Sequence, residues 1–501
     1  MEADSDDEIY SRDSQQSSDA EGRDPSPFSD EEYGIDETLQ PFGSNAPPSI
    51  MPNRKLQPFA DDCKTYDIIP LVAAIQACHI HSLDVTKNMR WVFTGGEDGF
   101  IRKYDFFSSM RGKTLLTQNQ KHTQVESVQK AGVILSYWEN EEIPISLPVV
   151  VKPENPDGIT EEGVESNVQE PPMPELKMSS VYSLAVQSEA VWLLSGLELA
   201  YGLLEFHKFH SRTLLITLKA MSLVSGAINL FTVRHEEGRC HHVMRQHKSP
   251  VSVLKITSDE TSFVSGSWDK SILHWDLHTG LVAREYSGHN SQISSIAFRP
   301  ITHSSPSSQA SIQSSPTSLE TVFEESDNTI NHSRDILLTT SIDGNCFIWD
   351  RRLANFIPRK LPVPEKTPPW CLSACWSADG NKIYCGRRNG TVDEWDFASG
   401  KFVRSFKMPS NSGPVSCVAS MPNGKHIVCA STDNIRLWNV DESETARSIV
   451  PFLIVPGHHG GTISQILIDP NCRYMITTSG NRGWEGSSTE TALFYEIIPI
   501  V

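Results

Sequence analysis

Seven stretches of the chain repeat one pattern of polar and apolar positions. Each begins with small residues, continues through a polar turn of Asp, Asn or Gly, and ends in an alternating apolar run closed by an aromatic residue. Such a turn followed by period-two alternation is typical of a β-hairpin. The stretches span residues 94–106, 225–233, 265–277, 339–351, 385–397, 429–440 and 477–497, and their closing aromatics are Tyr104, Phe231, Trp275, Trp349, Trp395, Trp438 and Phe494. The pattern predicts seven hairpins of one design.

An apolar strand is predicted ahead of each hairpin. These strands cover residues 80–85, 181–186, 251–256, 293–298, 371–376, 415–420 and 463–468. Once the Ser-rich stretch 301–335 is set aside, the closing aromatics from Phe231 to Trp438 recur at intervals near the roughly 40–45 residues of a WD repeat, and the last step, to Phe494, is 56 residues. The sequence therefore predicts an all-β fold, a seven-bladed WD-repeat β-propeller.

The last hairpin leaves its blade one strand short, because only residues 498–501 follow it. Residues 66–72, ahead of the first repeat, supply a spare strand, and pairing the two would remove an exposed sheet edge. We expect residues 63–501 to form the propeller, with insertions at about 113–178, 199–224 and 301–335. Residues 1–62 are expected to form an acidic disordered arm, since they are too polar to bury a core.

Two blades carry a His, Ser or Thr, Asp and Trp at the positions that form a buried hydrogen-bonded lock in WD repeats. The two sets are His247, Ser265, Asp269 and Trp275, and His289, Thr339, Asp343 and Trp349. A His beside Ser and Asp is also the composition of a catalytic triad. Because the set recurs from blade to blade, we interpret it as structural and reject the triad.

The second hairpin is interrupted. Removing residues 199–224 joins SGLE to SGAINLFTV and restores the length of the third hairpin, with Phe231 at the position of Trp275. The inserted segment is apolar and basic, unlike the other insertions. It is either a functional amphipathic insert or translated intron sequence, and we favour the second interpretation.

Charge is concentrated outside the predicted blades. The chain has 501 residues and a formal net charge of −19, and residues 1–40 hold fourteen acidic residues against two arginines, a net of −12. Segment 152–178 adds seven acids against two lysines, which leaves the predicted blades nearly neutral. This balance argues against attraction to nucleic-acid backbones or anionic membranes and favours a basic partner.

No motif for catalysis, phosphate binding or metal binding stands out. The chain lacks GxxxxGK[ST], GxSxG and HExxH patterns, and its ten cysteines include no CxxC pair. Cys371 and Cys375 are the one close pair, which we interpret as strand neighbours and not as a metal clip. With neither a signal peptide nor a membrane span in view, we expect a soluble intracellular protein that is not an enzyme and has no cofactor, metal or small-molecule substrate.

Several stretches resemble one family of WD proteins closely. They are YDIIPLVAAIQACHIHSLDVTKNMRWVFTGGEDGFIRKYDF at 66–106, VILSYWENEE at 133–142, and the blade sequences 225–256 and 263–280. In these residues the chain is similar to the fungal WD-repeat subunits of the SAGA transcription coactivator, the suppressor-of-Ty number eight family. The likeness extends over nearly all of 60–501, apart from 199–224.

The resemblance implies a nuclear, non-catalytic scaffold in transcription regulation. Members of that family act with other SAGA subunits and bind TATA-binding protein, regulating its delivery to promoters, with no direct sequence-specific contact to nucleic acid. The basic DNA-binding saddle of TATA-binding protein suits an acidic partner. The alternative is a generic WD adaptor, such as a chromatin reader or a ubiquitin-ligase substrate receptor, because propellers serve many functions.

Four residues in blade turns are candidate partner contacts. Trp268 and Trp484 are large aromatics at positions where a core residue is not expected, and aromatics carry much of the binding energy of interfaces. Arg387 and Arg388 lie beside another turn, where a solvated loop is the alternative interpretation.

Overall fold

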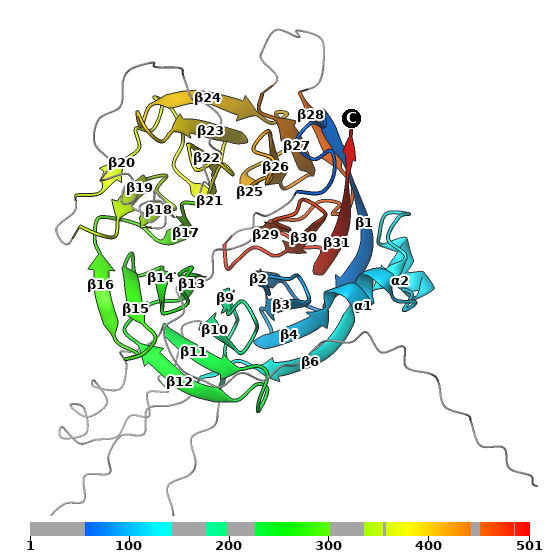
Figure 1. Cartoon of the computed structure of the whole chain (residues 1–501), viewed down its shortest axis with the longest axis horizontal. Helices are drawn as coiled ribbons and strands as arrows, with labels where there is room; N and C mark the ends of the chain where they lie inside the picture. The colour runs from blue at the N-terminus through cyan, green and yellow to red at the C-terminus, as the bar shows by residue number, and fades with distance from the viewer. Residues whose placement is uncertain are drawn as a thin grey trace, which may run out of the picture. The chain divides into compact units, whose positions relative to one another are not determined.

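The alternating stretches fold into seven antiparallel sheets arranged as a ring of blades (Figure 1). The computed structural model describes residues 56–142, 177–197, 226–300, 335–353, 357–441, 451–484 and 486–501. The first strands of neighbouring blades contact one another all the way around the ring. The predicted seven-bladed propeller is confirmed.

Each blade has four main strands, named here from the centre outward. Blade 1 consists of β2 (Ile80–Val85), β3 (Trp91–Gly96), β4 (Phe100–Asp105) and β6 (Val133–Glu139), and blade 2 of β9 (Ser183–Val186), β10 (Trp192–Gly196), β11 (Ala227–Thr232) and β12 (Cys240–Arg245). Blade 3 consists of β13 (Val251–Ile256), β14 (Ser262–Ser267), β15 (Ile272–Asp276) and β16 (Val282–Tyr286), and blade 4 of β17 (Ile293–Phe298), β18 (Ile336–Ser341), β19 (Cys346–Asp350) and β20 (Arg359–Lys360). Blade 5 consists of β21 (Cys371–Trp376), β22 (Lys382–Arg387), β23 (Thr391–Asp396) and β24 (Phe402–Lys407). Blade 6 consists of β25 (Val415–Ser420), β26 (His426–Ser431), β27 (Ile435–Asn439) and β28 (Phe452–Val455). Blade 7 consists of β29 (Ile463–Ile468), β30 (Tyr474–Ser479), β31 (Thr491–Ile500) and β1 (Thr65–Ile75).

The ring closes through the strand predicted for that role. β1 runs antiparallel to β31, with Asp67 opposite Ile498 and Ile68 opposite Ile497, and Figure 1 shows the two strands side by side in blue and red. Ile68 and Ile497 are both buried. The edge that β31 would otherwise expose is therefore paired within the chain.

The expected insertion at 113–178 has to be corrected, because part of it is blade structure. β6 pairs with β4, placing Trp138 opposite Ile101, and it forms the outer strand of blade 1. The connection before it contains α1 (Phe106–Arg111), α2 (Gln118–His122) and the short strand β5 (Lys130–Ala131), which pairs with β1. After it, β7 (Glu141–Glu142) pairs with β8 (Lys177–Met178). A long connection between the third and fourth strands had hidden this strand from the repeat pattern.

The folded part also begins earlier than residue 63. The backbone N–H of Gln57 donates to the carbonyl of Asn471 at 3.0 Å, and Ala60 is fully buried. Tyr66 donates its hydroxyl hydrogen to the carbonyl of Ala60. The side-chain amide of Asn423 in blade 6 also donates to the carbonyl of Ala60 at 3.2 Å. Residues 56–62 are therefore attached to the last two blades, and the predicted boundary of the arm was several residues too late.

The register of the second hairpin supports its predicted interruption. β10 and β11 pair with Gly196 opposite Ile228, and the backbone N–H of Leu197 donates to the carbonyl of Ala227 at 3.0 Å. The strands on either side of the insertion thus meet as one hairpin. Residues 199–224 themselves, like residues 301–334 and most of the predicted arm, lie outside the described residues.

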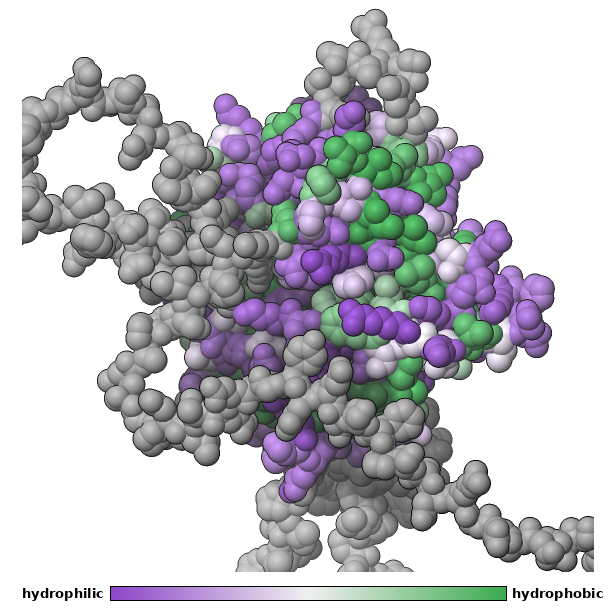
Figure 2. Space-filling view, turned by 45° about the vertical axis from the view of Figure 1, so that its right-hand side comes forward, coloured by the Kyte–Doolittle hydropathy of each residue, from purple (hydrophilic) through white to green (hydrophobic). Residues whose placement is uncertain are grey.

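The core lies between blades, and the closing aromatics of the repeats fill it. All seven of them are at most 4% exposed, and the ring of Trp275 stacks on Phe263 with centroids 5.8 Å apart. The rim is less uniform: Figure 2 turns the side that holds β1 toward the viewer and shows hydrophobic residues gathered over part of it. Among the described residues, no helix has the length and apolar composition needed to cross a membrane.

Candidate functional site

The turns of the blades divide between two faces of the ring. Because successive strands are antiparallel, the turns between second and third strands lie on one face, here called the upper face. The turns between first and second strands, and between third and fourth, lie on the lower face. Trp268 between β14 and β15, Trp484 between β30 and β31, and Arg388 between β22 and β23 therefore share the upper face.

A loop of blade 7 crosses the centre of the upper face. The guanidinium of Arg482 donates to the carbonyl of Ser294 on β17 at 2.6 Å and to the carbonyl of Leu372 on β21 at 3.3 Å. Ser294 and Leu372 belong to the innermost strands of blades 4 and 5. An arginine from one side of the ring thus binds strands on the other side, across the centre of this face.

The loop is held by aromatic contacts as well. The ring of Trp484 stacks on Trp268 with centroids 6.1 Å apart, and Trp268 in turn lies 5.4 Å from Tyr182 of blade 2. The indole N–H of Trp484 donates to the Oε1 of Gln292 at 3.3 Å. We call Tyr182, Trp268, Arg482 and Trp484 the channel cap.

Glycine is required between the two cap residues of the loop. Gly483 has a φ of 77°, and a Cβ there would lie 2.7 Å from Cε1 of Tyr182 and 2.8 Å from Cη2 of Trp268. Both the backbone conformation and the close approach exclude a side chain. The glycine therefore lets the loop lie flat on the aromatic rings.

The cap has one charged group in a largely aromatic setting. Burial lowers the pKa of Arg482 to about 10, so its guanidinium stays charged near neutral pH. Burial also lowers the pKa of His81, which stacks on Tyr182, to about 3, and this imidazole is neutral. Trp268 and Trp484 are half-buried. The arrangement offers an aromatic binding surface and brings together no nucleophile and general base.

The two candidate arginines are placed differently from the tryptophans. Arg387 is 1% exposed, its Nε lies 3.0 Å from Asp393, and its Nη1 donates to the carbonyl of Gly344 at 2.8 Å. Arg388 is exposed, with its guanidinium 4.1 Å from the ring centroid of Trp370. Arg387 thus joins blades 4 and 5 from inside, whereas Arg388 remains accessible on the upper face.

The first of the two expected locks has the geometry of a connected set. His247 lies 2.7 Å from the hydroxyl of Ser265 through Nε2 and 3.1 Å from Asp269 through Nδ1, and Trp275 donates to Ser265 at 2.8 Å. Burial alone would raise the pKa of Asp269. Hydrogen bonds from His247, from Ser271 and from the backbone of Lys248 outweigh burial and hold this pKa well below its usual value.

The second lock is assembled differently. His289 and Trp349 both bond Thr339 at 2.8 Å, but the Nδ1 of His289 meets the hydroxyl of Ser341, and Ser341 donates to Asp343. Asp343 therefore acts through an intervening serine. Blade 7 has a related set that the sequence patterns did not single out, in which His458 lies 2.8 Å from both Thr477 and Thr489. The dipeptide Gly457-His458 was its sequence signal.

Three cysteines that are far apart in sequence meet between blades 4 and 5. The Sγ atoms of Cys346, Cys371 and Cys385 all lie within 4.8 Å of one another, and all three residues are fully buried. Three thiols at this spacing could hold a soft metal ion. The guanidinium of Arg387, however, is close enough to interact electrostatically with all three and would oppose a cation. The expected absence of a bound metal stays a prediction.

The sequence is similar over most of its length to two curated proteins. The SAGA complex subunit Spt8 of Schizosaccharomyces pombe is 37% identical over 498 residues, which cover 90% of this chain and 83% of that protein. The SAGA complex subunit SPT8 of Saccharomyces cerevisiae is 37% identical over 481 residues, covering 86% of this chain and 73% of that protein.

A more distant relative shares part of the chain only. The guanine nucleotide-binding protein subunit beta of Zea mays is 25% identical over 200 residues, which cover 38% of this chain and 44% of that protein. A family model described as the SPT8 beta propeller matches residues 66–222, 204–335 and 306–498. With seven blades, ring closure through β1 and these matches, the chain belongs to the SPT8 beta-propeller family.

Proposed function

We propose that this chain is a non-catalytic interaction subunit of a SAGA-type coactivator in the nucleus, and that it binds TATA-binding protein and regulates its delivery to promoters. The names of the two 37% identical relatives support assembly with other SAGA subunits. The fold agrees with this role, because a ring of blades presents broad faces to partners and needs no catalytic centre.

The stacked pair of Trp268 and Trp484 is the observation that carries the proposed contact with TATA-binding protein. Both rings are half-buried and fixed by neighbours, so binding a partner would order few additional groups. Rigid aromatics of this kind are frequent hot spots.

Long-range attraction is assigned to the acidic N-terminal residues. Their net charge of −12 over residues 1–40 attracts a basic saddle, but salt screens such attraction within about 8–10 Å. The acidic residues therefore speed encounter, whereas the channel cap sustains the complex.

Surface-binding kinetics with purified TATA-binding protein over a series of salt concentrations test both roles. Trp484→Ala and Trp268→Ala should raise the dissociation rate about 5- to 30-fold, equivalent to about 1–2 kcal/mol. Phe402→Ala, which removes an exposed aromatic side chain from the outer strand of blade 5, serves as the control. Deleting residues 1–55 should slow association and flatten its salt dependence. Unchanged dissociation in both tryptophan variants would exclude the cap as the contact.

Copurification of the endogenous protein followed by mass spectrometry tests membership of the complex. Recovery of coactivator subunits is the expected result. Recovery of a cullin scaffold instead would identify a ubiquitin-ligase adaptor.

A further inference from the structure

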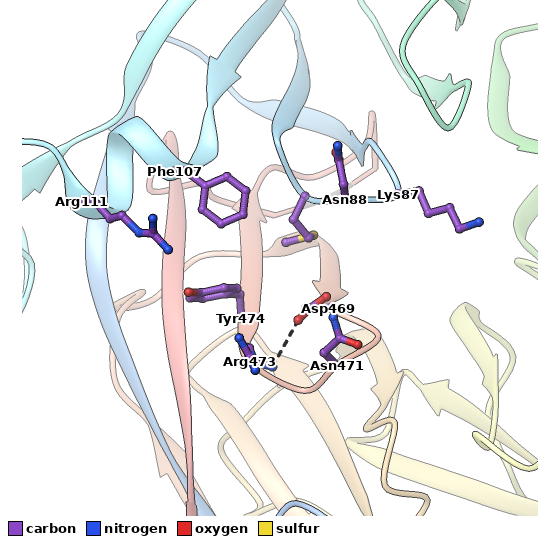
Figure 3. A pocket seen from close by; sticks show the side chains of 9 residues that line it. Lys87, Asn88, Phe107, Arg111, Asp469, Asn471, Arg473 and Tyr474 are labelled. Atoms are coloured by element: carbon purple, nitrogen blue, oxygen red, sulfur yellow. Dashed lines mark hydrogen bonds between the residues drawn. The ribbon is translucent and has the colours of Figure 1, made fainter. Parts of the chain in front are cut away.

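The lower face carries a pocket between blades 7 and 1, away from the channel cap. Its cavity volume is about 270 Å³. The turn between β2 and β3, helix α1, and the turn between β29 and β30 supply its walls, and Figure 3 shows the side chains that line it. All three elements belong to lower-face connections, so a ligand here would not compete for space with one on the cap.

The pocket is basic. Lys87, Arg111 and Arg473 are exposed and line it, whereas Asp469 is the one acid among the lining residues and is only 4% exposed. The carboxylate of Asp469 accepts the backbone N–H of Arg473 at 3.4 Å, which ties it to its own turn. Among the described residues, Arg111 and Arg473 have no ion pair. Glu496 faces Tyr474 across the strand pair but does not line the cavity.

The floor of the pocket is apolar and aromatic. Met89 is 3% exposed, and the rings of Phe107 and Tyr474 meet edge to face with centroids 6.5 Å apart. In Figure 3 these two rings lie at the centre of the view, with the guanidinium of Arg111 beside them. The guanidinium of Arg111 lies 5.5 Å from the Phe107 ring. An apolar side chain and an anionic group can thus be held next to each other.

Size and charge narrow the class of ligand. The cavity is smaller than the roughly 300–1,000 Å³ of typical cofactor pockets, so it suits one or two side chains. Nucleic acid would need a basic stripe along its backbone, and here the cations surround a single pocket in a nearly neutral propeller. The forked donors of two arginines match carboxylates well.

We propose that this pocket binds an acidic peptide segment of a partner protein, with its carboxylates on Arg111 and Arg473 and an apolar side chain against Phe107 and Tyr474. This goes beyond the contact with TATA-binding protein, since it assigns a ligand of opposite charge to the opposite face. A partner with an acidic tail could therefore be held while the cap is engaged.

Fluorescence anisotropy with the full chain tests the proposal. The probe is a short labelled peptide of glutamates around one phenylalanine, and the matched peptide has glutamine in place of glutamate. We expect the first peptide to bind and the second to bind at least about tenfold more weakly. Arg473→Glu and Arg111→Glu should each weaken binding of the acidic peptide about tenfold or more.

Lys401→Glu is the matched control. Lys401 is exposed in the turn between β23 and β24, on the same face, and its substitution changes the net charge equally. Equal weakening by this control would mean diffuse attraction and would overturn the proposal. Equal binding of the glutamine peptide, or displacement of the probe by inorganic phosphate at the same concentration, would overturn it too. If the acidic peptide binds only after residues 1–40 are deleted, these acidic residues occupy the pocket in the full chain. That result would make them, and not a partner protein, the ligand of the pocket.

Discussion

The indole of Trp484 stacks on the indole of Trp268 with ring centroids 6.1 Å apart and planes inclined by 28°, so that a loop of blade 7 rests on blade 3. These blades are not neighbours in the ring. Together with the bonds of Arg482 to blades 4 and 5, the stack couples parts of the propeller that its blade-to-blade contacts leave separate.

Arg482→Ala should lower the free energy of unfolding by about 1–3 kcal/mol. The substitution removes a buried charged donor and leaves the carbonyls of Ser294 and Leu372 without it. Urea denaturation measures the change. Arg239→Ala is the control, since this exposed arginine pairs with exposed Glu236 and should change stability by less than about 0.5 kcal/mol. Equal values for the two variants would contradict a structural role for the cap.

Ring closure makes the stability depend on β1. Deleting residues 1–55 should shift the Tm by no more than about 1–2 °C, whereas a deletion through residue 75 should prevent a cooperative melt. At single-residue level, Ile68→Ala should cost about 2–5 kcal/mol because Ile68 is 3% exposed. Asp67→Ala, its exposed neighbour on the same strand, should have little effect. Calorimetry of these four proteins would reveal whether closure carries the fold.

Buried histidines predict loss of stability in mild acid. Burial lowers the pKa of His289 to about 4 and that of His458 to about 3. Between pH 6.5 and 4 the unfolded chain takes up a proton at each of these histidines that the folded state does not, so stability falls as the pH is lowered. The slope approaches ~1.4 kcal/mol per pH unit for each histidine.

Thermal melts from pH 7 to pH 5 measure this slope. His289→Gln should reduce the slope of stability against pH by the contribution of one histidine. This reduction is expected whatever the substitution does to the Tm at pH 7. The paired carboxylate of Asp269 does not interfere, because its lowered pKa affects stability only below about pH 4. A Tm that is constant from pH 7 to pH 5 would refute the assignment.

The interruption of the second hairpin predicts a processing product. The mature transcript should join Glu198 directly to Ser225, and a chain lacking residues 199–224 should be at least as stable as the full chain. The pairing of Gly196 with Ile228 provides the reason, since the hairpin register is set outside the insertion. A transcript containing the segment, together with loss of folding when it is removed, would show that the insert is functional.

Thiol labelling distinguishes the cysteines by burial. Cys346, Cys371 and Cys385 are fully buried, and burial raises the pKa of Cys385 far above that of a free thiol. They should react with maleimide only after unfolding, whereas half-buried Cys78 and Cys240 should react first. Peptide mapping reads out the order. We expect elemental analysis of the purified protein to find no stoichiometric zinc or copper, and a stoichiometric metal lost on Cys385→Ala would reverse that expectation.

The repeat made the propeller predictable, because a polar turn and a closing aromatic residue mark each blade within a short stretch of sequence. The strand β1 was predictable for a related reason, since one hairpin lacked its neighbour. Arg482 was not, because the loop that carries it has no counterpart in the other repeats and its partners lie on distant strands. The strand β6 was masked by the connection that contains α1 and α2. The basic pocket is formed by connections of blades 1 and 7 that are far apart in sequence. No local sequence pattern predicts that they lie side by side.

Of the four strands of blade 7, β1 is synthesised before any blade and β31 after every other strand. While the chain grows, β1 can pair only with the two residues of β5, and its longer pairing with β31 has to wait until six blades have been made. Closure of the ring is therefore a late step of folding, which cannot occur before β31 has been synthesised. A ribosome that stops short of residue 491 releases an open arc with two free edges, which is the form that chaperones and proteases are built to recognise.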